Sequence, residues 1–254
     1  MNLLRGLRLA PEGADVIVIS LVLFLLIVVL VISIKAFVFK ILLLLSLVWL
    51  IAVLQFFRDP VRVSPNGDGI IIAPADGKII DVSSDMFRGE NSLLIARNEE
   101  TKQSKSLDKF NSKSDQDGST GEIFATRIAI FMSPINVHVN RSPVSGKILD
   151  VEYRKGKFIT AFNPESERVN ERTLITMQTN NGKMAFSQVA GYLARRIIFH
   201  PQKGDTLKMG ERVGMIRFGS RSDIYLPDNV KVLVKPGQKV KAGVTILGEF
   251  TNED

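Results

Sequence analysis

A Gly-Ser pair at residues 219 and 220 offers the most distinctive chemistry in this chain of 254 residues. The pair lies in the run Ile216-Arg-Phe-Gly-Ser-Arg-Ser-Asp223. Gly219 allows backbone conformations that other residues resist, so the Ser220 hydroxyl can approach the Gly219 carbonyl carbon. Attack there converts the amide to an ester, and elimination followed by hydrolysis gives a chain that begins with a pyruvoyl ketone. Gly-Ser pairs are common in turns, so this interpretation needs support from other residues.

Few other side chains in the sequence are reactive. There is no cysteine and there are only two histidines, which excludes disulfides, zinc fingers, iron–sulfur clusters, cysteine nucleophiles and three-histidine metal centres. His138 is the candidate general acid or base because histidine titrates near neutrality. The alternative for His138 is a histidine whose hydrogen bonds are satisfied within a strand. His200 is expected to be structural, on a strand or at its end.

Two long uncharged segments, 16–34 and 41–57, stand near the beginning of the chain. As one helix, positions 16–57 would extend about 63 Å, whereas the hydrocarbon core of a bilayer is about 30 Å thick. The pattern therefore predicts two short transmembrane helices with a tight turn near Lys35–Lys40; a single bent or re-entrant segment is the alternative. The positive-inside rule places the flanking basic residues on the cytoplasmic side; these are Arg5, Arg8, Arg58 and Arg62.

From Pro60 onward, short β-branched runs alternate with Gly, Pro, Asn and Asp, which is typical of strands and turns. A short helical pattern around Glu165 to Arg172 is an exception. The stretch 98–121 is polar and charged. We expect a solvated loop there rather than a nucleic-acid site, because Phe110 is its only aromatic residue. The net charge of +7 suits an anionic lipid surface.

An internal repeat predicts the architecture of this β-rich part. Gly204-Asp-Thr-Leu-Lys-Met-Gly210 is echoed by Gly237-Gln-Lys-Val-Lys-Ala-Gly243, and a hydrophobic run follows each segment. Two such strand–turn–strand units indicate a β-sandwich with pseudo-symmetry, which resembles the barrel-sandwich fold of biotinyl and lipoyl carrier domains. In those carriers a lysine at a hairpin tip is modified. The corresponding position here is Ser220, so the tip carries a different chemistry.

Several separated blocks of sequence between residues 56 and 227 resemble the phosphatidylserine decarboxylases, in their short, archaeal-type form. The blocks follow the order of that family and are Phe56-Phe-Arg-Asp-Pro60, Pro74-Ala-Asp-Gly-Lys78, Met132-Ser-Pro-Ile-Asn-Val-His-Val-Asn-Arg-Ser-Pro143, Asn170-Glu-Arg172, Ala194-Arg-Arg-Ile197 and Gly214-Met-Ile-Arg-Phe-Gly-Ser-Arg-Ser-Asp-Ile-Tyr-Leu-Pro227. The last block is the most specific, and an apolar segment ahead of the first block also fits the short form.

The resemblance implies self-cleavage between Gly219 and Ser220. The products are a β chain of residues 1–219 and an α chain of residues 220–254 headed by a pyruvoyl group. In this family the ketone forms a Schiff base with the amine of phosphatidylserine and accepts the electron pair released as CO2 leaves, which yields phosphatidylethanolamine. The resemblance implies neither a metal nor pyridoxal phosphate as cofactor.

The resemblance also suggests roles for side chains around the cleavage position. Longer members carry a second histidine three residues after the one that matches His138, and this chain has Arg141 there. A literal Asp–His–Ser triad therefore does not carry over, and either His138 serves both stages or another group assists. Asp76 matches the aspartate that orients the histidine in longer members; a plain turn aspartate is the alternative. Candidates to bind the lipid phosphate or carboxylate are Arg141, Arg217 and Arg221.

We therefore expect a mostly β fold of barrel-sandwich type, preceded by a transmembrane helical hairpin. Residues 1–57 would be a membrane anchor and residues 58–254 a catalytic domain on the cytoplasmic face of the cell's inner membrane. The expected partners are a serine-headed phospholipid, the membrane, and the cleaved α and β chains for each other, with no nucleic acid.

Two alternatives stay open from the sequence. One is a membrane-tethered barrel-sandwich carrier or adaptor, which would keep its chain intact and would need long helical hairpins that the soluble part does not show. The other is a processing-dead relative that binds lipid without cutting itself. The presence of both Ser220 and His138 disfavours the second alternative.

Overall fold

The computed structural model describes residues 7–34, 36–83, 87–88, 123–124, 126–160, 166–192, 196–217 and 220–251. At 87–88, 123–124, 167–168 and 220 only the backbone is described. Gly219 and the polar stretch 98–121 lie outside the described residues.

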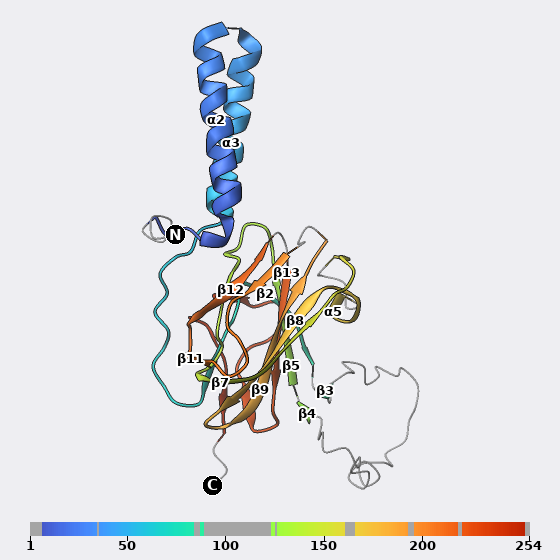
Figure 1. Ribbon diagram of the computed structural model, residues 1–254. Helices are drawn as coiled ribbons and strands as arrows, with labels where there is room; N and C mark the ends of the chain where they lie inside the picture. The colour runs from blue at the N-terminus through green and yellow to red at the C-terminus, as the bar shows by residue number, and fades with distance from the viewer. Residues whose placement is uncertain are drawn as a thin grey trace.

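Two long apolar helices form an antiparallel hairpin that projects from a β-rich body (Figure 1). A short 3-10 helix, η1 (Pro11–Gly13), leads into α2 (Ala14–Ile34), and α3 (Phe37–Phe56) returns to the body. Both are long and apolar enough to cross a membrane. The predicted hairpin is confirmed, but its turn is shorter than expected, because Lys40 lies inside α3.

A polar contact joins the two helices within their apolar length. The indole N–H of Trp49 on α3 donates to the hydroxyl of Ser20 on α2 at 3.0 Å, and Ser20 is buried. The small Ser20 side chain lets the helices approach, and the hydrogen bond satisfies two polar groups that a bilayer would leave without water. This contact fixes the register of the two helices.

The body consists of antiparallel strands in a curled arrangement (Figure 1). The large sheet has the order β11 (Thr206–Leu207), β7 (Gly146–Arg154), β8 (Arg172–Thr179), β9 (Gly182–Ala190), β13 (Ser220–Leu226), β5 (Thr126–Met132), β2 (Gly77–Ser83) and β15 (Lys239–Val240). The prediction of a mostly β fold of barrel-sandwich type is confirmed.

Smaller sheets complete the body. Two have three strands each: β1 (Ile70–Ile72), β16 (Ile246–Phe250) and β14 (Val230–Val232) in one, and β10 (Arg196–Phe199), β12 (Arg212–Arg217) and β6 (Val139–Arg141) in the other. A two-stranded ribbon pairs β3 (Phe87–Arg88) with β4 (Ile123–Phe124), and one helical turn, α5 (Ser166–Val169), lies within the segment predicted to be helical. Apolar side chains from the large sheet and both three-stranded sheets fill one continuous core.

The predicted repeat occupies the two edges of the large sheet. The segment 204–210 forms the edge strand β11, which pairs with β7, and the segment 237–243 forms the edge strand β15, which pairs with β2. All four boundary glycines have positive φ, between 75° and 96°, a conformation that favours glycine. The pattern of glycines in the sequence is therefore a pattern of tight turns at two equivalent places.

Each turn segment packs on a second repeated element, which the sequence analysis did not identify. Residues 73–82 read APADGKIIDV and residues 142–151 read SPVSGKILDV. Their hydrogen bonds match: Gly243 donates its N–H to Ala73 O and Gly210 to Ser142 O, both at 2.9 Å. The body is therefore two interlocked copies of one unit, each copy assembled from two segments far apart in the chain.

The base of the hairpin is docked on the body through a buried apolar cluster. This docking cluster comprises Ala10, Ile17, Val53, Phe56 and Phe57 from the hairpin and its flanks, and Val137, Val139 and Met215 from the body. Phe57 has no exposed surface. Two adjacent aromatic rings, Phe56 and Phe57, are buried in this cluster, and aromatic side chains bury large apolar areas, so the hairpin and the body form one packed unit.

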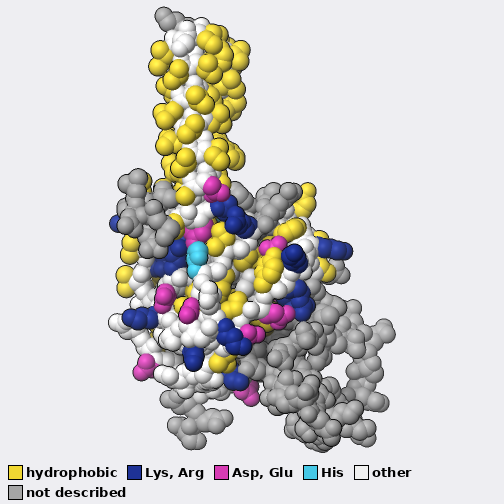
Figure 2. All heavy atoms as spheres, in the orientation of Figure 1, with side chains coloured by type: hydrophobic (Ala, Val, Ile, Leu, Met, Phe, Trp, Pro, Cys, Tyr) yellow, Lys and Arg dark blue, Asp and Glu magenta, His cyan; other side chains and the backbone are white. Residues whose placement is uncertain are grey.

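Ion pairs fasten the same junction from outside. On the hairpin side the acids are Glu12, Asp15 and Asp59; Glu12 pairs with Arg212 and His200, Asp15 with Arg217, and Asp59 with Arg141 and Arg212. Charged side chains accordingly gather where the apolar helices meet the body, as Figure 2 shows. His200 follows β10 directly and bonds Glu12 at 2.6 Å, which agrees with the structural role predicted for it.

We predict that Phe57→Ala loosens the docking of the hairpin. Loss of a fully buried phenyl ring from a packed cluster typically costs about 3–5 kcal/mol, and the cost here falls on the junction. Hydrogen exchange of detergent-purified protein should show faster exchange at the amides of Val137–Arg141. Val61→Ala, at a side chain that is 72% exposed, is the control and should change nothing. Unchanged protection in Phe57→Ala would contradict the docking role of the cluster.

Candidate active site

Ser220 enters the large sheet at the point where the chain passes from one sheet to another. β12 ends at Arg217 in a three-stranded sheet, and β13 begins at Ser220 in the middle of the large sheet. There Ser220 pairs with Met132 on β5 and with Ala190 on β9. The peptide bond predicted to be cut, between Gly219 and Ser220, therefore lies at this crossing.

The loop between β5 and β6 contacts the strands on both sides of the crossing, one at each of its ends. Before the loop, β5 ends at Met132, which pairs with Ser220. The last residue of the loop is His138, whose backbone carbonyl accepts the N–H of Ile216 at 3.3 Å. The loop is therefore tied to β12 at Ile216 and to β13 at Ser220. The fold thus brings the two main candidates, His138 and Ser220, to one junction from positions 82 residues apart in the sequence.

His138 is fully buried, and its ring packs on the last residue of α3. The centroids of the imidazole and of the Phe56 phenyl ring are 4.1 Å apart, with an angle of 32° between the planes. Burial, together with the positive charge of Arg58, lowers the pKa of His138 from 6.5 to about 4, against a smaller opposing effect of its hydrogen bond to Asn136. His138 is therefore neutral at physiological pH.

The hydrogen bond of His138 decides which ring nitrogen carries the proton. Nδ1 lies 3.0 Å from the carbonyl oxygen of Asn136. A carbonyl oxygen only accepts, so Nδ1 carries the hydrogen and Nε2 of the neutral ring has a free lone pair. Nε2 is buried and has no hydrogen-bond partner among the described residues. A buried, unpaired basic nitrogen is the form that a general base takes.

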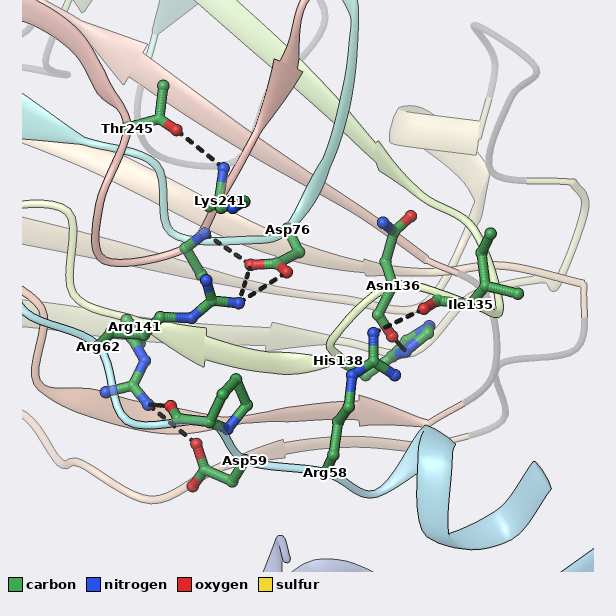
Figure 3. Close-up of polar contacts among 12 residues, drawn as sticks. Arg58, Asp59, Arg62, Asp76, Ile135, Asn136, His138, Arg141, Lys241 and Thr245 are labelled. Carbon is green, nitrogen blue, oxygen red and sulfur yellow. Dashed lines mark hydrogen bonds and ion pairs between the residues drawn. The ribbon is translucent and has the colours of Figure 1, made fainter. Parts of the chain in front are cut away.

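Two side chains brace the loop that carries this histidine. Arg58 donates one hydrogen bond to Gln55 O at the end of α3 and another to Ile135 O at 2.7 Å, as Figure 3 shows for the second. Asn136 accepts from the hydroxyl of Ser133 at 2.7 Å, which closes the turn. The end of α3 therefore contacts His138 directly through Phe56 and holds its loop through Arg58.

The carboxylate of Asp76 faces away from His138. It forms an ion pair with Arg62 at 2.9 Å and accepts the N–H of Ala242 at 2.7 Å (Figure 3). In the second copy of the repeated unit, Ser145 accepts the N–H of Met209 at 2.9 Å in the same way. Asp76 therefore does what the turn of each copy requires, and the group that orients His138 among the described residues is the carbonyl of Asn136.

The three candidate arginines all pair with acids of this chain. Arg141 bonds Asp59 at 2.9 Å, and Arg221, which is buried, bonds Asp223 at 2.5 Å. Arg217 bonds Asp15 at 2.9 Å, and Asp15 is more than half exposed. Arg221 directly follows Ser220 in sequence but is buried, whereas Arg217, three residues before Ser220, lies at the base of the hairpin through its bond to Asp15.

A buried asparagine fixes the strand beside Ser220. Asn170 donates to Ala190 O at 2.7 Å and to Ile159 O at 2.8 Å, and it accepts the N–H of Ile159 at 2.9 Å. Ala190 is the β9 partner of Ser220. Asn170 thus locks one wall of the crossing, a positioning role that the sequence analysis did not assign although Asn170 begins one of its blocks.

Another buried polar pair lies next to the junction. Gln188, two residues before Ala190, donates to the side-chain oxygen of Asn140 at 2.9 Å. Its own side-chain oxygen is buried without a partner among the described residues. The described part of the chain holds no group of three or more His, Asp or Glu side chains that could bind a metal ion.

Comparison with known families agrees with this geometry. The family model for phosphatidylserine decarboxylase matches residues 49–248, which include the end of α3, the histidine loop and the crossing at Ser220. The chain belongs to the phosphatidylserine decarboxylase family.

Individual relatives agree over most of their length. A phosphatidylserine decarboxylase proenzyme from Pelodictyon phaeoclathratiforme is 42% identical over 201 residues, 79% of this chain and 80% of the relative. One from Chlorobaculum tepidum is 37% identical over 245 residues, 96% of this chain and 98% of the relative. A protein from Methanothermobacter thermautotrophicus, provisionally named an archaetidylserine decarboxylase proenzyme, is 40% identical over 78% of this chain and 80% of its own length.

We predict that Phe56→Ala raises the pKa of His138. Removal of the ring admits water to the imidazole, and burial is the largest cause of the lowered pKa. Protonation then begins nearer pH 6.5 as the pH falls, so the neutral base is lost at a higher pH than in the parent protein. Phe56→Leu keeps the site apolar and should titrate nearly as the parent does.

NMR of protein labelled at its two histidines measures this titration, with His200→Gln to assign the signals. The same midpoint for His138 in Phe56→Ala and in the parent would show that the helix end does not control its charge.

Proposed function

We propose that this chain is a self-processing, pyruvoyl-dependent decarboxylase that converts phosphatidylserine to phosphatidylethanolamine and CO2. The observation that carries the proposal is the buried, neutral His138, whose Nε2 has no partner among the described residues and whose loop begins at Met132, the strand partner of Ser220. Family membership and the proenzyme names of the relatives support the same activity.

Self-cleavage would begin with the hydroxyl of Ser220. His138 Nε2 accepts the hydroxyl proton while the oxygen attacks the carbonyl carbon of Gly219, and the amide nitrogen leaves with a proton to give an ester. Loss of the Ser220 α-proton then releases the Gly219 carboxylate and leaves dehydroalanine. Water hydrolyses that group to a pyruvoyl group and ammonia. The pKa of about 4 keeps His138 neutral at physiological pH, so that Nε2 can accept a proton in each of the two abstractions.

The residues around position 220 fit a pyruvoyl group. The group supplies a ketone that holds the substrate amine and accepts the electron pair released with CO2. His138, with its free Nε2, can hold and return a proton there, and the strand neighbours Met132 and Ala190 fix the position. We assign the substrate phosphate to Arg217, whose partner Asp15 is exposed and can be displaced. Arg141 and Arg221 support the site through Asp59 and Asp223.

The two products of cleavage would stay together without a covalent bond. The α chain, 220–254, contains β13, which pairs on both sides with strands of the β chain. It also contains β16, which pairs with β1, and β15, which pairs with β2. A central strand hydrogen-bonded on both edges exchanges only if the whole sheet opens. This pairing supports the proposed self-association of the cleaved chains.

We assign residues 1–57 to the membrane anchor and residues 58–254 to the catalytic domain on the cytoplasmic face of the membrane. Two observations support this division: the apolar length of α2 and α3, and the basic residues that flank them on the side of the body. Relatives named for phosphatidylserine and for archaetidylserine are 37% and 40% identical to the chain over the matched residues. Both lipids present the same serine headgroup, on which the proposed chemistry acts.

We predict that Ser220→Ala remains one uncut chain and forms no phosphatidylethanolamine from phosphatidylserine in mixed micelles. Alanine has no hydroxyl, so neither the ester nor the ketone can form. Ser222→Ala, two residues along the same strand, is the matched control; Ser222 donates to Ser187 O at 2.8 Å and has no assigned chemistry. The control should be cut and active. An uncut but active Ser220→Ala protein would refute the mechanism.

We predict that His138→Gln slows self-cleavage by about 10²–10⁴-fold, the usual contribution of a general base. Glutamine preserves a polar group of similar size but cannot accept the proton. His200→Gln changes the other histidine of the chain, which bonds Glu12 and has no assigned chemistry, and should be cut at the parent rate. Time courses of cleavage after cell-free synthesis measure both variants. Equal rates for all three proteins would remove His138 from the reaction.

A further inference from the structure

The two loops that flank Ser220 each carry a large apolar side chain in solvent. Ile135, on the loop that follows β5, is 76% exposed, and Tyr192, on the segment that follows β9, is 67% exposed. Single exposed apolar residues are common on protein surfaces. These two are distinguished by their place, because they stand on either side of the position where the proposed reaction occurs.

Strand pairing fixes that place. Met132 and Ala190 are the last residues of β5 and β9, and both pair with Ser220, the first residue of β13. Ile135 follows Met132 by three residues, and Tyr192 follows Ala190 by two. Both side chains therefore project from the same end of the large sheet, with Ser220 between their strands.

This end of the sheet faces the membrane-spanning hairpin. Arg58 donates one hydrogen bond to Gln55 O in the last turn of α3 and another to Ile135 O. One guanidinium group bridges the two carbonyls, so Ile135 lies beside the last turn of α3, at the base of the hairpin (Figure 3). The exposed Ile135 side chain thus lies next to the end of the hairpin's apolar surface.

Exposed basic residues accompany the apolar pair at this level. Arg8 is joined to the hairpin base, since its carbonyl accepts the N–H of Asp59 at 2.6 Å. Arg196 lies at the start of β10, opposite Arg217, which is bonded to Asp15 at the base of α2. Arg8 and Arg196 are exposed. Apolar and aromatic side chains mixed with cations are typical of surfaces that lie in the headgroup layer of anionic membranes.

We propose that Ile135 and Tyr192 form a lipid-facing rim that enters the interfacial layer of the bilayer on both sides of Ser220. The occupant of this surface is the bilayer itself, which the hairpin already holds at this height. The rim deepens the proposed function: it sets the reacting position at the depth of the serine headgroup, so the substrate reacts without its acyl chains being withdrawn from the membrane. Withdrawal of each methylene would oppose binding.

Tryptophan fluorescence tests the rim directly, because Trp49 is the only tryptophan of the chain. In a Trp49→Phe background, Ile135→Trp and Tyr192→Trp each place one tryptophan in the rim. The full-length protein is reconstituted into vesicles with lipids brominated near the headgroup end of the acyl chains. In both variants the tryptophan emission should lie at shorter wavelength than that of a tryptophan in water, and the brominated lipids should quench it strongly.

The matched control is Asp228→Trp in the same background. Asp228 is exposed and follows the far end of β13, roughly 20 Å or more from Ser220 at about 3.3 Å per residue. Its tryptophan should not be quenched. Quenching of both rim positions but not of position 228 supports the rim. Failure of quenching at either rim position, or equal quenching at all three, overturns it.

Activity provides a second measurement that separates the rim from the proposed function. Ile135→Asp and Tyr192→Asp should be cut normally and should decarboxylate a short-chain, monomeric phosphatidylserine at the parent rate. On phosphatidylserine vesicles each should be about tenfold or more slower, because a charge opposes entry into the interface. Equal losses on both substrates would overturn the rim. Inactivity of the parent on both would instead contradict the proposed function, while the quenching experiment would still test the rim.

Discussion

The packing of Phe56 on His138 is the contact on which the rest of the site depends. It excludes water from the imidazole and keeps it neutral, and the carbonyl of Asn136 then leaves Nε2 as the free nitrogen. Phe56 is also the last residue of a helix whose length and composition suit a membrane. The same phenyl ring therefore belongs to the docking cluster and to the wall of the candidate active site. We therefore expect a change at the hairpin base to alter the environment of the His138 imidazole.

The interlocked sheets explain how a chain can be cut in its core and stay folded. Each copy of the repeated unit combines an early and a late segment, 73–82 with 237–243 and 142–151 with 204–210. The late segments lie on both sides of the cleavage position in sequence. Strands of the proposed α chain therefore pair with the β chain in the large sheet and in one of the smaller sheets. In the proposed cleavage, only the crossing between β12 and β13 would lose its covalent link.

Much of this architecture could be predicted from the sequence because its signals are local. Uncharged length predicted the hairpin, and alternating β-branched runs with glycine turns predicted the mostly β body. The hairpin turn was predicted to be too long because nothing in residues 37–40 stops a helix, and α3 begins at Phe37. The sequences of 73–82 and 142–151 are similar, but their structural equivalence depends on hydrogen bonds to the distant segments 237–243 and 204–210.

The roles of individual side chains were harder to predict, since they depend on tertiary contacts. His138 and Ser220 were identified through their chemistry and family blocks, and the fold brings them to one junction. The orienting role of Asp76 stays a prediction. Its carboxylate forms an ion pair with Arg62 and accepts the N–H of Ala242. Phe56, Arg58 and Asn170 lie in the same blocks, yet only the structure indicates that the first two hold the histidine loop and the third holds the strand beside Ser220.

The intact mass of the purified full-length protein under denaturing conditions tests the central claim most directly. The account predicts two chains, residues 1–219 and 220–254. The mass of the smaller chain should correspond to a pyruvoyl group in place of the serine amino terminus, and this chain should resist amino-terminal sequencing. One full-length chain in a folded preparation would contradict self-cleavage at the crossing and with it the proposed mechanism.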